Sequence, residues 1–195
     1  MSLFVLNEKE RRVMVKIVTD STSDLSLDLA QEFGITIVPL NVHFGPDEVY
    51  RDRVDLSMEE FYRKLVSSKT VPTTSTPSPG AFAEAFDKLS EETNEILAVV
   101  ISTKYSATYN AALKGKEEMK RRDCRVEVID TLNTIMGLGL MAIVAAKEAQ
   151  KGANLEQLSS MVKELIPKAH ARFSMDTLEY LRKGGRIGTA KSFPK

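Results

Sequence analysis

The chain has 195 residues, of which 43% are hydrophobic and 28% charged, and this composition is typical of a folded globular protein. Its 27 Lys and Arg residues balance 27 Asp and Glu residues, which argues against general nucleic-acid binding because such binding depends on neutralising phosphates. A single cysteine excludes an internal disulfide framework and a multi-cysteine zinc site. Two histidines leave little for a histidine-based metal site, so we expect no metal.

The sequence shows no evident targeting or membrane signal. Its longest apolar run, 135–146, is shorter than the about 20 residues that a membrane span needs. At the N-terminus the apolar residues precede the charges, which reverses the order of a secretory signal. We therefore expect a cytoplasmic protein without stable membrane insertion, in which 1–13 is a tail and Met14 is an alternative natural start.

The first predicted elements are short. A run rich in β-branched residues at 15–19 predicts a buried parallel strand, and a helix is expected at 26–33. A second strand region covers 35–44, where Pro39 bends the strand or marks an edge. A short strand near 49–50 is expected to return antiparallel.

Further along, strands and helices alternate. The pattern S-x-x-E at Ser57 is a capping box that opens a helix to about residue 66. The stretch 67–80 is rich in Ser, Thr and Pro, which is typical of a loop. The elements that follow are expected at 81–92 (helix), 95–102 (strand), 106–122 (helix), 126–129 (strand), 135–151 and 154–165 (helices), 171–175 (strand) and 177–183 (helix).

This alternation predicts the fold class. Strands that alternate with helices through 15–151 favour an α/β fold with a Rossmann-like parallel sheet and helices on both faces. In open sheets of this kind, ligands bind beyond the carboxyl ends of the strands.

Hydroxyl side chains dominate the segments expected at those ends. Together with backbone N–H groups at helix N-termini, hydroxyls suit a small anion such as a carboxylate. The alternative is that the same residues only cap helices. The residues concerned are Ser21, Thr22 and Ser23, Ser102, Thr103 and Ser106, Thr131, and Thr73, Thr74, Ser75, Thr76 and Ser78.

Several motifs suggest other functions, but the surrounding sequence does not support those functions. The segment 137–142 has the dinucleotide form G-x-G-x-x-A, yet its glycines lie beyond the strand end and more simply allow a close approach to a helix or an apolar ligand. A second hypothesis is a small α/β enzyme, either a serine hydrolase or a kinase-like protein, that uses Ser21 or Ser106. The sequence contains neither a G-x-S-x-G elbow nor a P-loop, which argues against it. His43 and His170 are isolated in sequence, which favours structural roles.

A compact cationic group surrounds the glycine pair at 184–185. Arg182 and Lys183 are explained by compensation of a helix dipole at its C-terminus. Arg186 lies beyond the turn, where its guanidinium could clamp a carboxylate or phosphate with two hydrogen bonds.

Five segments carry a family resemblance. They are IVTDSTSDL at 17–25, TSTPSPGAF at 74–82, ISTKYSATYNAA at 101–112, VIDTLNTIMGLGLMA at 128–142 and DTLEYLRKGGRIG at 176–188. Each motif is weak alone, but in order and spacing the set resembles the DegV family of bacterial fatty-acid-binding proteins. The resemblance covers 15–188, nearly the whole chain.

The resemblance implies an EDD fold of two α/β domains with a long-chain fatty acid between them. It also implies a lipid-binding protein that is not itself an enzyme, has no catalytic residue, cofactor or metal, and presents the fatty acid to a partner fatty acid kinase. Carried over by motif, the carboxylate ligands are Thr74, Ser75, Thr103, Ser106 and Arg186. The residues expected to line the acyl tail are Met136, Leu138, Leu140 and Met141.

The chain departs from the family pattern in two places. In the second hydroxyl loop, Ala107 stands where the family has glycine, and the family's two leading serines are Ser102 and Thr103 here. The sequence also stops soon after Gly188, whereas the family continues through a second domain that includes a C-terminal histidine. We therefore expect a DegV N-terminal domain at 14–166, with 67–80 as its ligand loop, and the start of a truncated second domain at 167–195. A remnant without lipid binding remains an alternative.

Overall fold

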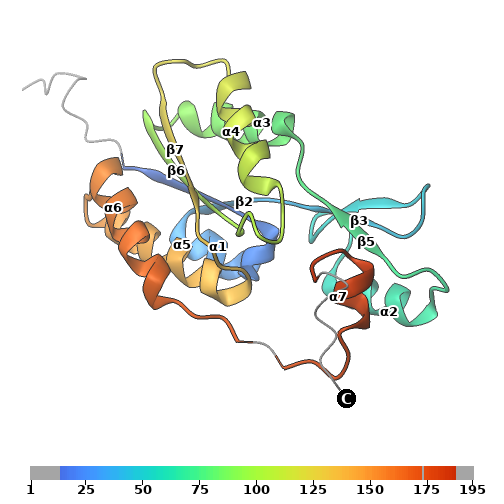
Figure 1. The fold of residues 1–195 in the computed structure, drawn as a ribbon. Coiled ribbons are helices and arrows are strands. Elements are labelled where there is room, and N and C mark those ends of the chain that lie inside the picture. Colours follow the sequence, from blue (N-terminus) through green and yellow to red (C-terminus); the bar gives the residue numbers. More distant parts are fainter. Residues whose placement is uncertain (1–13, 173, 188–195) are drawn as a thin grey trace, which may run out of the picture.

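The main body is built on a parallel sheet of four strands (Figure 1). The computed structural model describes residues 14–172 and 174–187. The strand order is β2-β1-β6-β7, and every neighbouring pair is parallel, as predicted. The strands are β1 (Lys16–Asp20), β2 (Ile35–Val38), β6 (Glu95–Val100) and β7 (Arg125–Asp130).

Helices cover both faces of this sheet, which confirms the predicted fold class (Figure 1). One face carries α1 (Leu27–Phe33), α5 (Ile135–Gln150) and α6 (Leu155–Leu165), and the other carries α3 (Pro79–Ser90) and α4 (Thr108–Glu118).

Alternation along the strands assigns their side chains to the two cores. In β6, Leu97 and Val99 join the cluster beneath α5 and α6, whereas Ile96, Ala98 and Val100 join the cluster beneath α3 and α4. A strand buried on both faces reads as a continuous apolar run, and this explains why 95–102 was recognisable in the sequence.

A separate antiparallel sheet, β4-β3-β5, lies beyond the carboxyl ends of the parallel strands (Figure 1). It consists of β3 (Asn41–His43), β4 (Val49–Arg51) and β5 (Thr73–Ser75). The predicted bend at Pro39 separates β2 from β3, and β4 returns antiparallel as expected. Helix α2 (Met58–Ser67) opens with the predicted capping box of Ser57 and Glu60 and places Phe61 against buried Val42, Phe44 and Leu56.

The C-terminal segment differs from its prediction. The described residues of 171–175 form no strand and are exposed, so the predicted strand is wrong there. A strand needs a sheet edge to pair with, and the described residues of this segment pair with none. The chain instead passes through a 3₁₀ turn, η3 (Ile166–Lys168), to a short helix, α7 (Glu179–Lys183). The predicted tail at 1–13 lies outside the described residues.

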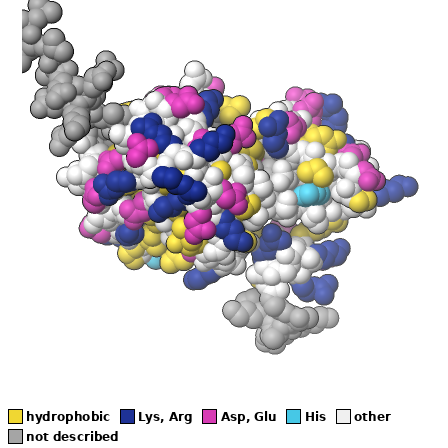
Figure 2. Space-filling model, turned by 90° about the horizontal axis from the view of Figure 1, so that it is seen from above, with side chains coloured by type: hydrophobic (Ala, Val, Ile, Leu, Met, Phe, Trp, Pro, Cys, Tyr) yellow, Lys and Arg dark blue, Asp and Glu magenta, His cyan; other side chains and the backbone are white. Residues whose placement is uncertain are grey.

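Charge is finely mixed on the face that carries α3 and α4. Figure 2 shows Lys and Arg side chains interspersed with Asp and Glu there, without a large area of one sign. The pattern agrees with the balanced charge of the sequence, and the described residues on this face offer no extended basic surface for a polyanion. Within the ranges that the structure describes, no helix combines the length and apolarity needed to cross a bilayer.

Candidate functional site

Hydrogen bonds fix the small sheet beside the strand ends. The backbone N–H of Leu40 donates to Ser21 Oγ in the turn that follows β1, with an N···O distance of 3.1 Å. Arg53 follows β4 and donates to the carbonyl of Leu25 at 2.7 Å and to Asp24 Oδ1 at 2.9 Å. Arg53 has a backbone φ of 60°, and no sequence pattern indicated its bracing role.

Asp20 is a buried brace at the end of β1. Its Oδ2 accepts from the backbone N–H of Ile101 at 2.8 Å, and its Oδ1 accepts from the N–H of Thr22 at 2.9 Å and from the Thr22 hydroxyl. Burial raises the pKa of Asp20, although these hydrogen bonds act in the opposite direction. The carboxylate therefore joins β1 to the loop after β6 and is closed to ligands.

Other hydroxyls at the strand ends are also occupied within the fold. The Thr131 hydroxyl donates to the carbonyl of Val100 at 2.9 Å, and Ser102 Oγ accepts from the N–H of Lys104 at 3.2 Å. Thr131, Ser102 and Ser21 are all buried. For these three residues the structural alternative, in which hydroxyls stabilise loops and turns, is the better one.

Two predicted ligands, Thr103 and Ser106, lie in the loop after β6. The exposed Thr103 donates its hydroxyl to Asp130 Oδ2 at 2.6 Å. Ser106 is half-buried, and its Oγ lies 2.8 Å from Thr108 Oγ1. A ligand carboxylate at Thr103 would face the negative Asp130, so Thr103 would have to turn away from Asp130 to bind it.

The other two predicted hydroxyl ligands point to opposite faces of β5. Thr74 pairs with buried Val42, whereas Ser75 pairs with Asn41, and successive side chains of a strand alternate between faces. Ser75 Oγ lies 2.8 Å from His43 Nε2. The sequence did not reveal this contact because 32 residues separate the two side chains.

A cavity of about 520 Å³ brings Thr74 and Arg186 together. It lies between the β5 segment and the α7 region, and its apolar lining is Val71, Pro72, Met175, Tyr180 and Leu181. Gly185, with φ of 72°, makes the turn that carries the exposed Arg186, whose Nη1 donates to the carbonyl of Gly184 at 2.6 Å. A hydroxyl donor and a guanidinium thus share one apolar-lined cavity.

The predicted tail contacts on α5 divide into two pairs. Leu138 and Met141 are 0% and 2% exposed and pack in the core against the parallel sheet, whereas Met136 and Leu140 are 39% and 55% exposed. Gly139 lets this helix approach the turn after β1, because an added Cβ would lie 2.5 Å from the carbonyl oxygen of Ser23. Packing thus accounts for the second glycine of the G-x-G segment.

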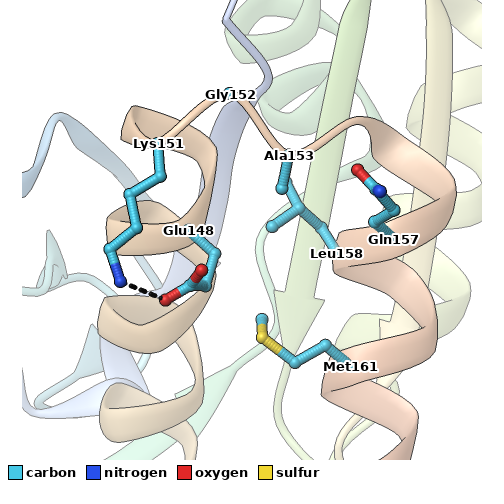
Figure 3. Close-up of a pocket in the computed structure, with 7 residues that line it drawn as sticks. All are labelled: Glu148, Lys151, Gly152, Ala153, Gln157, Leu158 and Met161. Carbon is cyan, nitrogen blue, oxygen red and sulfur yellow. Dashed lines mark hydrogen bonds and ion pairs between the residues drawn. The ribbon is translucent and has the colours of Figure 1, made fainter.

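Another pocket, of about 410 Å³, lies at the turn between α5 and α6 (Figure 3). Glu148 and Lys151 pair with each other there at 2.7 Å, and Gln157 serves in the capping box of α6 (Figure 3). Its polar groups are engaged within the protein, and the predicted site residues lie elsewhere.

The geometry gives no support to a serine hydrolase. Of the two hydroxyls considered, Ser21 receives the Leu40 amide and Ser106 contacts Thr108, whereas His43 contacts Ser75. Burial raises the pKa of the Cys124 thiol and keeps it from being a ready nucleophile. Among the described residues, His, Cys, Asp and Glu side chains form no group of three or more suited to a metal ion.

The fold and site define an α/β protein whose hydroxyl-bearing strand and single arginine meet at an apolar-lined cavity. A family model described as "Uncharacterised protein, DegV family" matches residues 14–193. The chain belongs to the DegV family, as its motifs indicated.

Curated relatives carry the same family domain. A DegV domain-containing protein of Caldanaerobacter subterraneus subsp. tengcongensis is 36% identical over 178 residues, which are 91% of this chain and 62% of that protein. Another, from Clostridium perfringens, is 38% identical over 178 residues, which are 90% of this chain and 62% of that protein. The chain therefore spans somewhat less than two thirds of the length of these relatives.

Solved structures extend the likeness to lipid-binding proteins. A DegV family protein of Thermus thermophilus, described by its fatty acid binding, has a TM-score of 0.79 at 36% identity, covering 92% of this chain and 63% of its own. A stearic acid-binding protein of Eubacterium ventriosum has a TM-score of 0.85 at 33% identity, with 92% and 62% covered. A protein of Thermotoga maritima, described as revealing a fatty acid binding function, has a TM-score of 0.82 at 31% identity, with 90% and 64% covered.

Proposed function

We propose that this chain binds one long-chain fatty acid, with the carboxylate held by hydroxyls of the β5 segment and by Arg186. The cavity that Thr74 and Arg186 share carries the proposal. A carboxylate needs few donors, and a hydroxyl with a guanidinium supplies charge-assisted hydrogen bonds. The fatty acids bound by similar solved structures support the choice of ligand.

Ser75, Thr103 and Ser106 complete the proposed carboxylate site. Ser75 is exposed on the opposite face of β5 from Thr74, so the head group would lie across the strand end rather than on one face. Thr103 and Ser106 come from the loop after β6, and this loop follows a strand whose carboxyl end points toward the small sheet (Figure 1). Binding would exchange the Thr103–Asp130 hydrogen bond for one to the ligand.

The acyl tail is proposed to lie over α5. Met136 and Leu140 are the exposed members of the predicted lining, and Leu138 and Met141 support them from the core side of the helix. Burial of each CH₂ group contributes about 0.8 kcal/mol, so the tail would supply most of the affinity.

The protein's role would be to carry the fatty acid rather than to transform it. Presentation to a fatty acid kinase, which forms the acyl phosphate, follows from the family resemblance. The proposed cytoplasmic location rests instead on the sequence, which shows no evident targeting signal. In this scheme 14–166 provides the hydroxyl loops and 167–195 begins the second domain, from which Arg186 reaches the head group. No catalytic residue or cofactor is assigned to this chain.

Titration of delipidated protein with hexadecanoic acid tests the proposal. We expect saturable binding of one equivalent, and an approximately tenfold loss of affinity in Thr74→Val, because this change removes one hydrogen bond to a charged group and keeps the side-chain shape. Thr70→Val is the matched control, since Thr70 is exposed on the same segment outside the cavity. Equal affinity in Thr74→Val and the control, or no binding by the unaltered chain, would contradict the proposal.

A further inference from the structure

One face of the small sheet carries two polar side chains beside Ser75 that the proposed carboxylate site does not explain. Asn41 and His43 on β3 and Ser75 on β5 project to the same side, because Asn41 pairs with Ser75 and His43 lies two residues along. Ser75 Oγ lies 2.8 Å from His43 Nε2 and 3.4 Å from Asn41 Nδ2. Two nitrogen atoms therefore converge on a single hydroxyl.

The hydrogen-bonding capacity of a hydroxyl makes this convergence informative. A serine hydroxyl has one proton to donate and two lone pairs to accept with. The Asn41 amide nitrogen can only donate, so it occupies one lone pair of Ser75 Oγ. The protonation of His43 Nε2 decides how the other lone pair and the proton of Ser75 Oγ are used. Nε2 either donates a proton to Ser75 Oγ or accepts the hydroxyl proton from it.

The two states of His43 give Ser75 opposite properties. With a proton on Nε2, His43 fills the second lone pair, and the serine proton is directed outward to an acceptor. Without that proton, Ser75 donates to His43 and keeps one lone pair for a ligand that donates. A carboxylate is purely an acceptor, whereas an alcohol can also donate.

We propose that His43 is a positioning residue that makes Ser75 a hydrogen-bond donor and thereby selects a carboxylate head group over an alcohol. This inference rests on the proposed function, since it assumes that Ser75 meets the head group. The neighbouring cation on this face, Arg51, is engaged by both oxygens of Asp55 at 2.9 and 2.8 Å. Arg51 therefore does not compete with His43 for the serine hydroxyl.

Paired ligands of equal tail length separate a head-group effect from a general loss of structure. We expect His43→Leu to bind hexadecanoic acid up to about tenfold more weakly, because the Ser75 proton is no longer oriented toward the charged head group and that hydrogen bond weakens, and hexadecan-1-ol within about twofold of the unaltered protein. His43→Gln should restore acid binding to within about threefold, because its amide nitrogen can donate from a similar position.

The two histidines of the chain make a direct spectroscopic test practical. The imidazole ¹⁵N signals are assigned to His43 with a His170→Gln variant. In the complex with hexadecanoic acid, we expect the Nε2 signal of His43 to show a bound proton.

Each outcome has a definite meaning. An unprotonated Nε2 in the acid complex, or equal losses for acid and alcohol in His43→Leu, would overturn the role of His43 while leaving fatty acid binding intact. Failure of the unaltered protein to bind either ligand would instead defeat the proposed function, and this inference with it.

Discussion

Two neighbouring regions of the molecule use the same residue types differently. At the carboxyl ends of the parallel strands, Asp20, Ser21 and Ser102 are buried and bonded to nearby backbone groups. On the small antiparallel sheet, Thr74 and Ser75 are exposed at the edge strand β5. Hydroxyl-rich motifs therefore do not identify a ligand site by themselves, because burial decides whether a hydroxyl braces the fold or remains accessible.

The two regions also differ in how much core supports them. The main body has two large apolar clusters, one on each face of its sheet. The small sheet rests on Val42, Phe44 and Leu56, with Tyr50 and Phe61 packed against them. We expect the small sheet to open locally at a lower free energy than the main body.

Removing one aromatic ring from each region should produce the largest contrast. Phe86 is 0% exposed on the core side of α3, and Phe86→Ala should lower the free energy of unfolding by about 3–5 kcal/mol. Phe44 is 9% exposed in the small cluster, so Phe44→Ala should cost less and leave the main body folded. Urea unfolding with hydrogen exchange measures both effects, and equal global losses would show that the regions form one cooperative unit.

A smaller effect is expected from the carboxylate brace. Asp20→Asn should lower the free energy of unfolding by about 1–3 kcal/mol, because an amide that accepts from Thr22 cannot also accept from the buried N–H of Ile101. Asp47→Asn, at an exposed turn, is the control and should change stability by less than about 0.5 kcal/mol. If Asp20→Asn were as harmless as its control, the assignment of Asp20 as a brace would fail.

The smallest effect concerns an exposed ion pair on the small sheet. Hydrogen bonds from Arg51 lower the pKa of Asp55 from 3.8 to about 2. Because folding lowers the pKa of Asp55, the ion pair stabilises the fold fully at pH values above the ordinary pKa of 3.8. This contribution is lost as the pH falls through about 2. An NMR titration should find the Asp55 midpoint near 2, and Arg51→Gln should return it toward 3.8. An unchanged midpoint in Arg51→Gln would exclude Arg51 as the cause.

Local chemistry made much of the fold predictable. The capping boxes at Ser57 and Asn154 begin α2 and α6, and Pro39 separates two strands because its ring fixes the backbone and removes an amide donor. The predicted strand at 171–175 failed because strand formation depends on a partner edge, which local sequence does not contain.

The site was less predictable because it depends on register and burial. The contact of His43 with Ser75 follows from the pairing of β3 with β5, which no local pattern encodes. The α5 residues could have been divided by helical spacing, since 138 and 141 share the core face while 136 and 140 lie four residues apart on another. No sequence pattern predicted the role of Arg53, because that role depends on two contacts with the turn after β1, which is distant in sequence.

Fatty acid binding by this chain is the central claim, and native mass spectrometry tests it most directly. We predict that the purified protein carries, or takes up on addition of hexadecanoic acid, one fatty acid per chain. Delipidation should remove that mass, and extraction should yield the free acid. A folded protein that shows no adduct in either sample, and no saturable binding on titration, would contradict the account.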